Sequence, residues 1–406
     1  MQGCFIVSDS VFKRYRNFLK NDAVKFIVLM GIVSLFADMT YEGARSITGP
    51  YLAILGASAV AVGFVAGFGE LLGYLLRFFS GRLSDRTHSY WAITIVGYFI
   101  NLLAVPLLAL AGSWETAAAL IIIERVGKGI RVPSRDVMLS HACSQVGHGT
   151  GFGIHEALDQ IGAILGPLIV AVVLFFNGNY QIGFVFLLLP ATLAILVLLI
   201  SRSLYPHPHN LEVNIIKLDA KGFKKAYWLY VVAAGLIAAG FADFALIAYH
   251  FQKVTLFSAA FIPILYAIAM GVDGVSALIF GRLFDKKGFS IIILVALISA
   301  LFAPFVFLGG FYMAFLGIIL WGISMGAQES IMRSSIAIMS PIQRRGSAYG
   351  VFNTIYGVSW FAGSLLMGIL YSFSINYLVI FSVLIQVISI PIFISILKIR
   401  KTQEKN

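Results

Sequence analysis

Gly81-Arg82-Leu83-Ser84-Asp85-Arg86 stands between two apolar runs, each of which is long enough to cross a bilayer. The same G-R-L-x-D-[RK] pattern returns two hundred positions later as Gly281-Arg282-Leu283-Phe284-Asp285-Lys286, again between two apolar runs. A short polar connection that occurs twice in one chain indicates an internal repeat. We therefore expect two related halves.

The composition is that of a membrane protein. Of the 406 residues, 60% are hydrophobic and only 12% are charged, which is too apolar for a water-soluble globule. A spanning helix needs about 20 mostly apolar residues, so the length allows about a dozen spans. The formal charge of +11 does not favour nucleic-acid binding, because the basic residues lie between apolar runs rather than on a separate domain. Cys4 and Cys143 have neither a metal-binding spacing nor the pattern of a disulfide framework.

Hydropathy predicts twelve spans with short connections. They cover residues 25–49, 59–80, 90–111, 115–138, 151–176, 182–201, 227–251, 259–280, 290–309, 313–335, 347–371 and 376–397. We therefore predict an all-α membrane protein whose twelve transmembrane helices form two pseudo-symmetric six-helix bundles, 25–201 and 227–397, around a central cavity. Residues 1–24 precede the first bundle, residues 202–226 link the bundles, and residues 398–406 form a tail.

The basic residues predict the orientation of the chain. Lys and Arg gather in the segments on one side of the predicted spans, among them Arg82, Arg86, Lys224, Lys286 and Lys398. Cytoplasmic loops of membrane proteins retain such positive charge. We therefore expect a multi-pass protein of the cell membrane with both termini and the linker in the cytoplasm, which an even number of spans also requires.

Ionisable residues occur in some spans and not in others. The third, sixth, ninth and twelfth spans carry none in their interiors. The remaining spans carry Asp38, Glu42, Glu70, Glu124, Arg125, Glu156 and Asp159 in the first half and Asp243, Asp273 and Glu329 in the second. Charge within the membrane is costly unless it faces protein or water. We therefore expect every third helix to face lipid and the others to surround a polar cavity.

Two six-span halves joined by a basic linker, with the repeated motif after the second and eighth spans, resemble the major facilitator superfamily. Arg125-x-x-x-Gly129 resembles the fourth-helix motif of that family, which is associated there with proton coupling. Gly162-x-x-x-Gly166-Pro167 resembles the start of the fifth-helix antiporter motif, which is commoner among exporters. The resemblance implies two halves that rock about a substrate site near the membrane midplane. It does not identify a subfamily.

The same resemblance implies a gating role for the repeated motif, which in that family is thought to hold the inner gate shut. The gating loops would then contain Gly81, Asp85, Arg86, Gly281, Asp285 and Lys286. The glycine allows a tight turn, and the aspartate can accept hydrogen bonds from a helix N-terminus or pair with an arginine. The alternative is that each aspartate only solubilises a surface turn. The first motif has His88 where the second keeps Gly288.

The first half carries more intramembrane carboxylates than basic residues at the same depth. Asp38, Glu70 and Asp159 are expected near the middle of their spans, whereas Arg131 and Arg135 are expected to snorkel to the inner interface or to form structural pairs. A carboxylate without a full partner in a low dielectric can hold a proton at physiological pH. We therefore expect proton coupling in the first half, with interhelical salt bridges as the alternative. The second half would shape the cavity through Asp243, Asp273, Glu329, Asn353 and Tyr356.

These patterns predict a secondary transporter that moves a small organic solute by alternating access, with proton-coupled export favoured. An uptake symporter or facilitator of the same fold stays open. The sequence has no Walker loop, so ATP hydrolysis is not expected. An intramembrane enzyme would need a metal cluster, which only His155-Glu156-Asp159 approaches, and a sensor would need a soluble output domain. We expect a monomer in the bilayer whose partners are a small-molecule substrate and protons, with no metal, cofactor or nucleic acid.

Overall fold

The computed structural model describes residues 21–208, 225–339 and 345–403. Residues 1–20 of the expected N-terminal segment, 209–224 of the linker and 404–406 of the tail therefore lie outside the described residues. Nothing in the structure tests the domain boundaries or the cytoplasmic location of these segments, which stay predictions.

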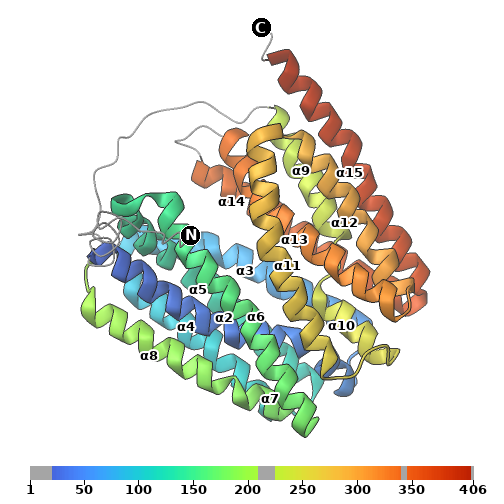
Figure 1. Cartoon of the computed structure of the whole chain (residues 1–406), viewed down its shortest axis with the longest axis horizontal. Coiled ribbons are helices and arrows are strands. Elements are labelled where there is room, and N and C mark those ends of the chain that lie inside the picture. The colour runs from blue at the N-terminus through green and yellow to red at the C-terminus, as the bar shows by residue number, and fades with distance from the viewer. Residues whose placement is uncertain (1–20, 209–224, 340–344, 404–406) are drawn as a thin grey trace, which may run out of the picture.

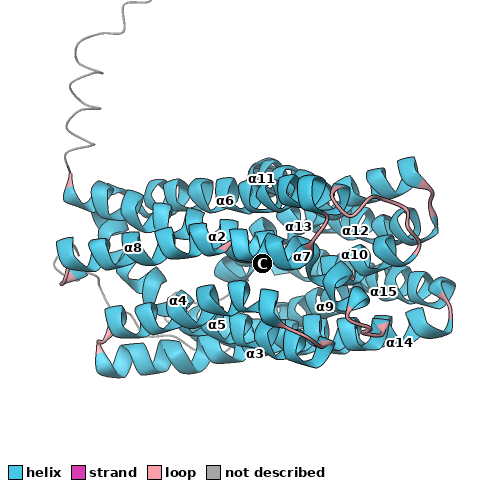
Figure 2. Ribbon diagram, turned by 90° about the horizontal axis from the view of Figure 1, so that it is seen from below, coloured by secondary structure: helices cyan, strands magenta, loops and turns pink. Residues whose placement is uncertain are grey.

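Every described element is a helix, as Figure 2 shows. The first bundle consists of α2 (Asp22–Ile54), α3 (Ala59–Thr87), α4 (Tyr90–Leu107), η1 (Leu108–Leu110), α5 (Trp114–Val146), α6 (His148–Asn177), α7 (Tyr180–Phe186) and α8 (Leu188–Leu204). The second bundle consists of α9 (Lys225–Gly240), α10 (Phe244–Lys253), α11 (Phe261–Lys287), α12 (Ser290–Leu308), α13 (Phe311–Met339), α14 (Arg345–Phe373) and α15 (Ile375–Gln403). The prediction of an all-α fold is confirmed.

Within the described residues, eleven helical segments are long and apolar enough to cross a membrane. Helix α5 is not one of them, because it carries a line of charged residues that includes Glu124, Arg125 and Lys128. Its 33 residues nevertheless span roughly 50 Å at the rise of an α-helix, which exceeds the hydrocarbon thickness. Helix α5 therefore corresponds to the predicted fourth span, 115–138, and brings the number of spans among the described residues to twelve.

The two bundles have the same internal packing. In the first bundle α2 packs on α6, α3 on α5, and α4 on α5; in the second, α9 packs on α14, α11 on α13, and α12 on α13. The second helix of each bundle also packs on the fifth helix of the other, as α3 on α14 and α11 on α6 (Figure 2). The same contact between bundles therefore occurs twice, as expected of two repeated halves.

The bundles are joined at one end of the molecule and diverge toward the other. We call the end at which α2 begins and α3 ends the basic end, because Arg82, Arg86 and Lys286 lie there. At the opposite end α2 packs on α10, where Gly49 lies against the backbone of Ala245. Figure 1 shows the two bundles splaying apart from this contact toward their basic ends.

The repeated motif is helical, which corrects the expected position of the two loops. Helix α3 continues through the motif to Thr87, and α11 continues to Lys287. The helices end at His88 and Gly288, whose φ values of 52° and 62° lie in the left-handed region. A left-handed residue is a common helix stop, and it occurs here at the same place in both halves. The polar motif residues therefore prolong each helix, and the turn follows them.

The predicted span 227–251 is interrupted, whereas the hydropathy had indicated one continuous helix. Helix α9 ends at Gly240 and α10 begins at Phe244. Asp243 is the N-cap of α10, and its carboxylate accepts a hydrogen bond of 2.9 Å from the backbone N–H of Ala245. The break therefore begins a new helix with a capped and charged N-terminus in the middle of the span.

Side chains from neighbouring helices satisfy the carbonyls that the break exposes. The Gly240 carbonyl accepts hydrogen bonds from Ser382 Oγ at 2.6 Å and Gln386 Nε2 at 3.0 Å, both on α15. The Ala242 carbonyl accepts one from Trp321 Nε1 of α13 at 2.9 Å. Such partners are necessary because hydrocarbon offers no water to unpaired backbone groups. The second bundle therefore satisfies the backbone carbonyls at the interruption with side chains of α13 and α15.

Candidate functional site

Buried charged side chains of α2, α3, α5 and the α10 cap form one network where the bundles meet. At its centre Arg45 Nη2 lies 2.8 Å from Asp243 Oδ2, which links the two bundles. Glu70 Oε1 lies 3.5 Å from Arg45 Nη2 and 3.4 Å from Arg125 Nη1. Glu70 therefore bridges two guanidinium groups that would otherwise repel each other.

Glu42 makes a second connection between the bundles. Its Oε2 accepts a hydrogen bond from the Tyr266 hydroxyl of α11, and its Oε1 lies 3.8 Å from Lys128 Nζ and 3.9 Å from Arg45 Nη1. Lys128 also lies over the ring of Tyr41, 4.0 Å from the centroid. The ammonium group is thus held between a carboxylate and an aromatic face.

Glu124 is engaged within the first bundle. Asn101 Nδ2 of α4 donates to Glu124 Oε1 at 2.6 Å, and Arg125 Nε lies 3.3 Å from Glu124 Oε2. The structure therefore places four residues of the predicted coupling set in ion pairs, namely Glu42, Glu70, Glu124 and Arg125. For these residues the structure shows salt bridges, which were the stated alternative to proton coupling.

Asp38 and Asp159 differ from the rest of the predicted coupling set. They lie on the packed helices α2 and α6 and interact electrostatically. Asp38 is buried and Asp159 is half-buried, and in each the Oδ1 atom has no hydrogen-bond partner in the part of the chain that the structure describes. Neither carboxylate is in an ion pair with a described residue. They are therefore the candidate proton-binding pair.

The predicted antiporter motif brings these two helices together. Gly162 and Gly166 lie against the backbone carbonyls of Leu35 and Met39, where a Cβ atom on either glycine would overlap the carbonyl oxygen. A Cβ on Gly162 would also come within 3.0 Å of Asp38 Cβ. The motif, whose Pro167 lies inside α6, therefore sets the close approach of α2 and α6 at the carboxyl pair.

The basic residues toward the basic end of α5 are buried. Arg131 is fully buried with its guanidinium 4.3 Å from the Tyr98 ring centroid, so the expectation that it snorkels is wrong. Arg135 forms the structural pairing that was the other expectation, with Asp136 at 2.9 Å and a hydrogen bond to Ser34 at 3.1 Å. These positive charges surround the region of Asp38 and Asp159.

The second bundle contributes a smaller polar group. Asp273 of α11 is buried and accepts a hydrogen bond of 3.4 Å from Gln160 of α6, which is a third link between the bundles. Glu329 is half-buried and Glu156 is exposed, and both interact electrostatically with Asp273. These three carboxylates therefore share one region, and Asp273 also interacts electrostatically with Glu42 of the network around Arg45.

The two other residues predicted to shape the cavity lie on α14. Asn353 is half-buried. Tyr356 is buried, its hydroxyl lies 3.5 Å from Gln328 Oε1, and its ring meets the ring of Tyr74 on α3 at a centroid distance of 6.0 Å. Tyr356 therefore contacts the first bundle through an aromatic pair.

The predicted gating residues lie at the basic ends. Gly81 lies against Pro133 of α5, and Gly281 lies against Ser330 of α13, the equivalent helix. Asp85, Arg86, Asp285 and Lys286 are exposed, and none has a hydrogen bond or ion pair to a residue that the structure describes. Their gating role stays a prediction, and the splayed arrangement is one in which a latch would be open.

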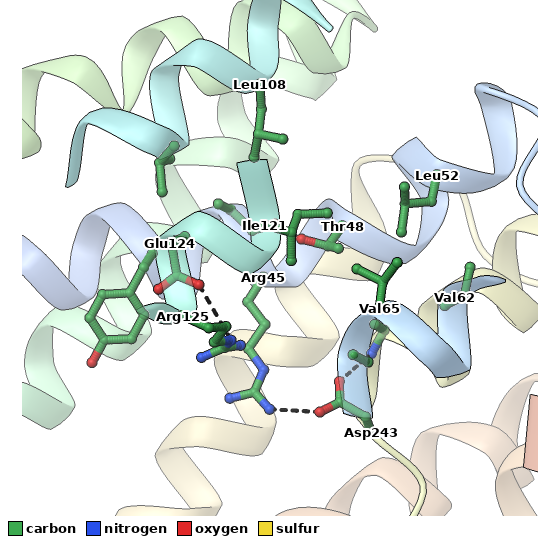
Figure 3. Close-up of a pocket in the computed structure, with 15 residues that line it drawn as sticks. Arg45, Thr48, Leu52, Val62, Val65, Leu108, Ile121, Glu124, Arg125 and Asp243 are labelled. Atoms are coloured by element: carbon green, nitrogen blue, oxygen red, sulfur yellow. Dashed lines mark hydrogen bonds and ion pairs between the residues drawn. The ribbon is translucent and has the colours of Figure 1, made fainter. Parts of the chain in front are cut away.

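A pocket lies beside the charged network between α2, α3, α4, η1, α5 and α10 (Figure 3). Its apolar walls include Leu52, Val62, Val65, Val105, Leu108 and Ile121. Its charged side chains Arg45, Glu124, Arg125 and Asp243 lie on one side, whereas the hydroxyl of Thr48 lies among the apolar residues (Figure 3). The pocket is thus amphipathic.

Several residues of this site were not among those predicted from the sequence. Arg45 and Lys128 share helical faces with predicted residues, and that spacing was the available signal. Asn101 was missed because its span was expected to face lipid, and a lone amide in an apolar span was the only sign of it. His155, considered for a metal cluster, instead lies 2.9 Å from Ser34 Oγ. Across the described ranges no three His, Cys, Asp or Glu side chains are grouped to hold a metal.

The chain is similar to known proteins along most of its length. A family model described as Major Facilitator Superfamily matches residues 29–364. An uncharacterised protein of Mycobacterium tuberculosis is 39% identical over 381 residues, which are 92% of this chain and 93% of that protein. An uncharacterised transporter of the MFS type from Methanocaldococcus jannaschii is 25% identical over 381 residues, which are 90% of this chain and 93% of that protein.

Solved structures share the fold at low sequence identity. A bacterial homologue of the human lysosomal transporter Spinster, in an inward-facing and unoccupied conformation, matches with a TM-score of 0.74 and 16% identity over 92% of this chain and 96% of that chain. A mutant of the nucleoside transporter NupG matches with a TM-score of 0.73 and 14% identity over 91% and 99%. A POT family transporter in complex with a thioalcohol-conjugated peptide matches with a TM-score of 0.74 and 13% identity over 93% and 96%.

Proposed function

Because the chain belongs to the major facilitator superfamily, we propose that this transporter exports a small organic solute in exchange for protons by alternating access. The family establishes the class of protein. The solute, the direction and the coupling ion are the parts that we propose.

The pair Asp38 and Asp159 is the observation that carries the proton coupling. Two carboxylates that share a low-dielectric site cannot both stay charged without cost, so one of them is expected to hold a proton. Their Oδ1 atoms, which have no partner among the described residues, leave room for that proton, whereas Glu70 and Glu124 each lie in an ion pair with Arg125. Asp159, being half-buried, can exchange its proton more readily than a fully enclosed group.

The direction of transport rests on the motif through which α6 packs against α2. The antiporter-like motif with Gly162 and Gly166 brings Asp38 onto the α6 helix that carries Asp159. A change in protonation at this contact would bear directly on how the two helices fit together. The proposed direction follows from the resemblance of Gly162-x-x-x-Gly166-Pro167 to the antiporter motif, which is commoner among exporters.

We further propose that the basic end faces the cytoplasm, in agreement with the distribution of Lys and Arg. The splayed arrangement would then be the inward-facing state of a protein that acts as a monomer in the cell membrane. Labelling of Ser89→Cys at the basic end by an impermeant maleimide checks the orientation. The label should react in inside-out vesicles and not in intact cells, and the reverse pattern would contradict it.

Inside-out membrane vesicles test coupling and direction together. In vesicles acidified by respiration, an exported solute should accumulate, and its addition should release protons from the lumen. Asp38→Asn should abolish both signals while the protein stays in the membrane. Accumulation that an uncoupler does not reduce would contradict proton coupling, and solute leaving the lumen together with protons would indicate an uptake symporter instead.

A further inference from the structure

We propose that the pocket beside Arg125 binds an uncharged amphipathic solute, with an apolar body against the aliphatic walls and an oxygen acceptor, such as a carbonyl or hydroxyl oxygen, against the arginines. This inference rests on the proposed function, because it names the class of solute that the transporter would carry. It follows from which polar groups of the pocket are already engaged.

The walls select an apolar body. Aliphatic side chains from α2, α3, α4, η1 and α5 make up most of the uncharged lining of the pocket, to which Thr48 and Tyr41 add a hydroxyl group each. Burial of such a surface is favourable by roughly 25 cal/mol per Å² of apolar area. A solute that was polar throughout would lose its hydration here without gaining partners.

The donors of the pocket are not all in use. Arg125 lies 3.3 and 3.4 Å from its two carboxylate partners but donates no well-aligned hydrogen bond to any residue that the structure describes. Arg45 places Nη2 on Asp243, while its buried Nε has no hydrogen-bond partner among the described residues. Both guanidinium groups therefore have N–H donors to offer, which favours a ligand that supplies acceptors.

The carboxylates of the pocket already have basic partners, which argues against a cationic solute. Asp243 accepts hydrogen bonds from Arg45 and from the backbone N–H of Ala245. Glu124 accepts a hydrogen bond from Asn101 and lies against Arg125. A cation in the pocket would have to break one of these pairs, which leaves a buried guanidinium or amide without its partner.

The charge of the network argues against an anionic solute. The ion pairs join three basic side chains, Arg45, Arg125 and Lys128, to four carboxylates, Glu42, Glu70, Glu124 and Asp243. The connected group is therefore already one negative charge in excess. A further buried anion would have no counter-charge, whereas a neutral oxygen can accept from the arginines without changing the balance.

The pocket also touches both bundles. Ala245 and Asp243 of α10 line it together with the residues of the first bundle. A bound solute would lie beside the Arg45–Asp243 pair that holds the bundles together at the end opposite the basic end. This position suits a solute whose binding has to be linked to the rocking of the bundles.

Binding to purified protein tests the solute class without requiring transport. The neutral probes are three methyl ketones: hexan-2-one, cyclohexyl methyl ketone and acetophenone. The anionic probes carry the same hydrocarbon groups on a carboxylate: pentanoate, cyclohexanecarboxylate and benzoate. The cationic probes are the matching amines: pentylamine, cyclohexylmethylamine and benzylamine. We expect thermal stabilisation by at least one ketone and a smaller shift from its charged counterparts. A charged probe that stabilises more than its matched ketone, or no stabilisation by any ketone, overturns the proposal.

Two variants on one helix decide whether the ketone occupies this pocket. Ala66→Leu fills the pocket and should weaken binding about tenfold or more. Ala61→Leu makes the same change at a half-buried position of α3 that does not line the pocket, and should leave the affinity unchanged. Equal effects of the two variants overturn the site. If the protein binds the ketone but transports no solute, the solute class stands and the proposed function is contradicted. If it transports only a charged solute, the proposed function stands and the solute class is contradicted.

Discussion

The Arg45 guanidinium lies 2.8 Å from the carboxylate of Asp243, which is also the N-cap of a helix that begins in the middle of its span. One residue therefore serves two purposes, because it starts α10 and ties the second bundle to the first. The helix break positions the carboxylate, and the ion pair uses it. We infer that the closed contact opposite the basic end depends on both.

Substitutions of Asp243 separate the two roles. Asp243→Asn keeps a capping side chain but removes the charge, and breaking a buried pair typically costs about 3–5 kcal/mol. Asp243→Ala also removes the cap, which costs about 1 kcal/mol more. Thermal unfolding should therefore rank wild type above Asp243→Asn and Asp243→Asn above Asp243→Ala. Asp285→Asn, at an exposed position, is the control, and a variant of Asp243 as stable as the control would contradict this account.

The interrupted span predicts a requirement for Gln386. Its amide donates to the Gly240 carbonyl, and its side-chain oxygen accepts from Ser299. Gln386→Leu should destabilise the protein by about 1–3 kcal/mol, because buried polar groups lose their partners. Ser395→Ala on the exposed face of the same helix should change stability little. Denaturant titration of the purified variants measures both, and equal stability of the two would argue against a structural role for the break.

The contact between α2 and α6 predicts a contrast between two glycines of one helix. Gly166→Ala places a methyl group on the carbonyl of Met39, so α2 and α6 must separate. Gly153→Ala meets open space, and alanine is the better helix former by roughly 1 kcal/mol. We expect Gly166→Ala to lower the unfolding temperature and Gly153→Ala to keep or raise it. A tolerated Gly166→Ala would mean that the close approach is not needed.

The fold was largely predictable because hydropathy is a local property. Apolar runs of sufficient length define spans without knowledge of their neighbours, and the repeat of the motif at Gly81 and Gly281 divides the chain into halves. The break before Phe244 was not predicted, since an apolar run continues through it. Gly240 followed by Asp243 is typical of a helix C-terminus followed by the N-cap of a new helix, and this pattern could have indicated the break.

The pairing of charges was less predictable, because it depends on how helices lie side by side. The sequence places Asp38, Glu42 and Arg45 on one face of a helix, but it does not show that Arg45 meets Asp243 nearly two hundred residues away. Likewise Arg131 has the spacing of an interfacial residue, yet α4 covers it with Tyr98. The sequence therefore names the candidate carboxylates, while their division into paired and unpaired groups required the structure.

We infer that protonation of the pair Asp38 and Asp159 controls how far the bundles splay. The distance between the two bundles at the basic end tests this inference most directly. Spin labels at Ser89→Cys and Ser290→Cys, two exposed positions of opposite bundles, report that distance once Cys4 and Cys143 are replaced by serine. Raising the pH should redistribute the distances in this background, because a carboxylate pair that loses a shared proton places two negative charges at one site. Asp38→Asn and Asp159→Asn should each abolish the redistribution, whereas Glu115→Gln, at an exposed position where α5 begins, should leave it intact. An unchanged pH response in both Asp38→Asn and Asp159→Asn would contradict the account.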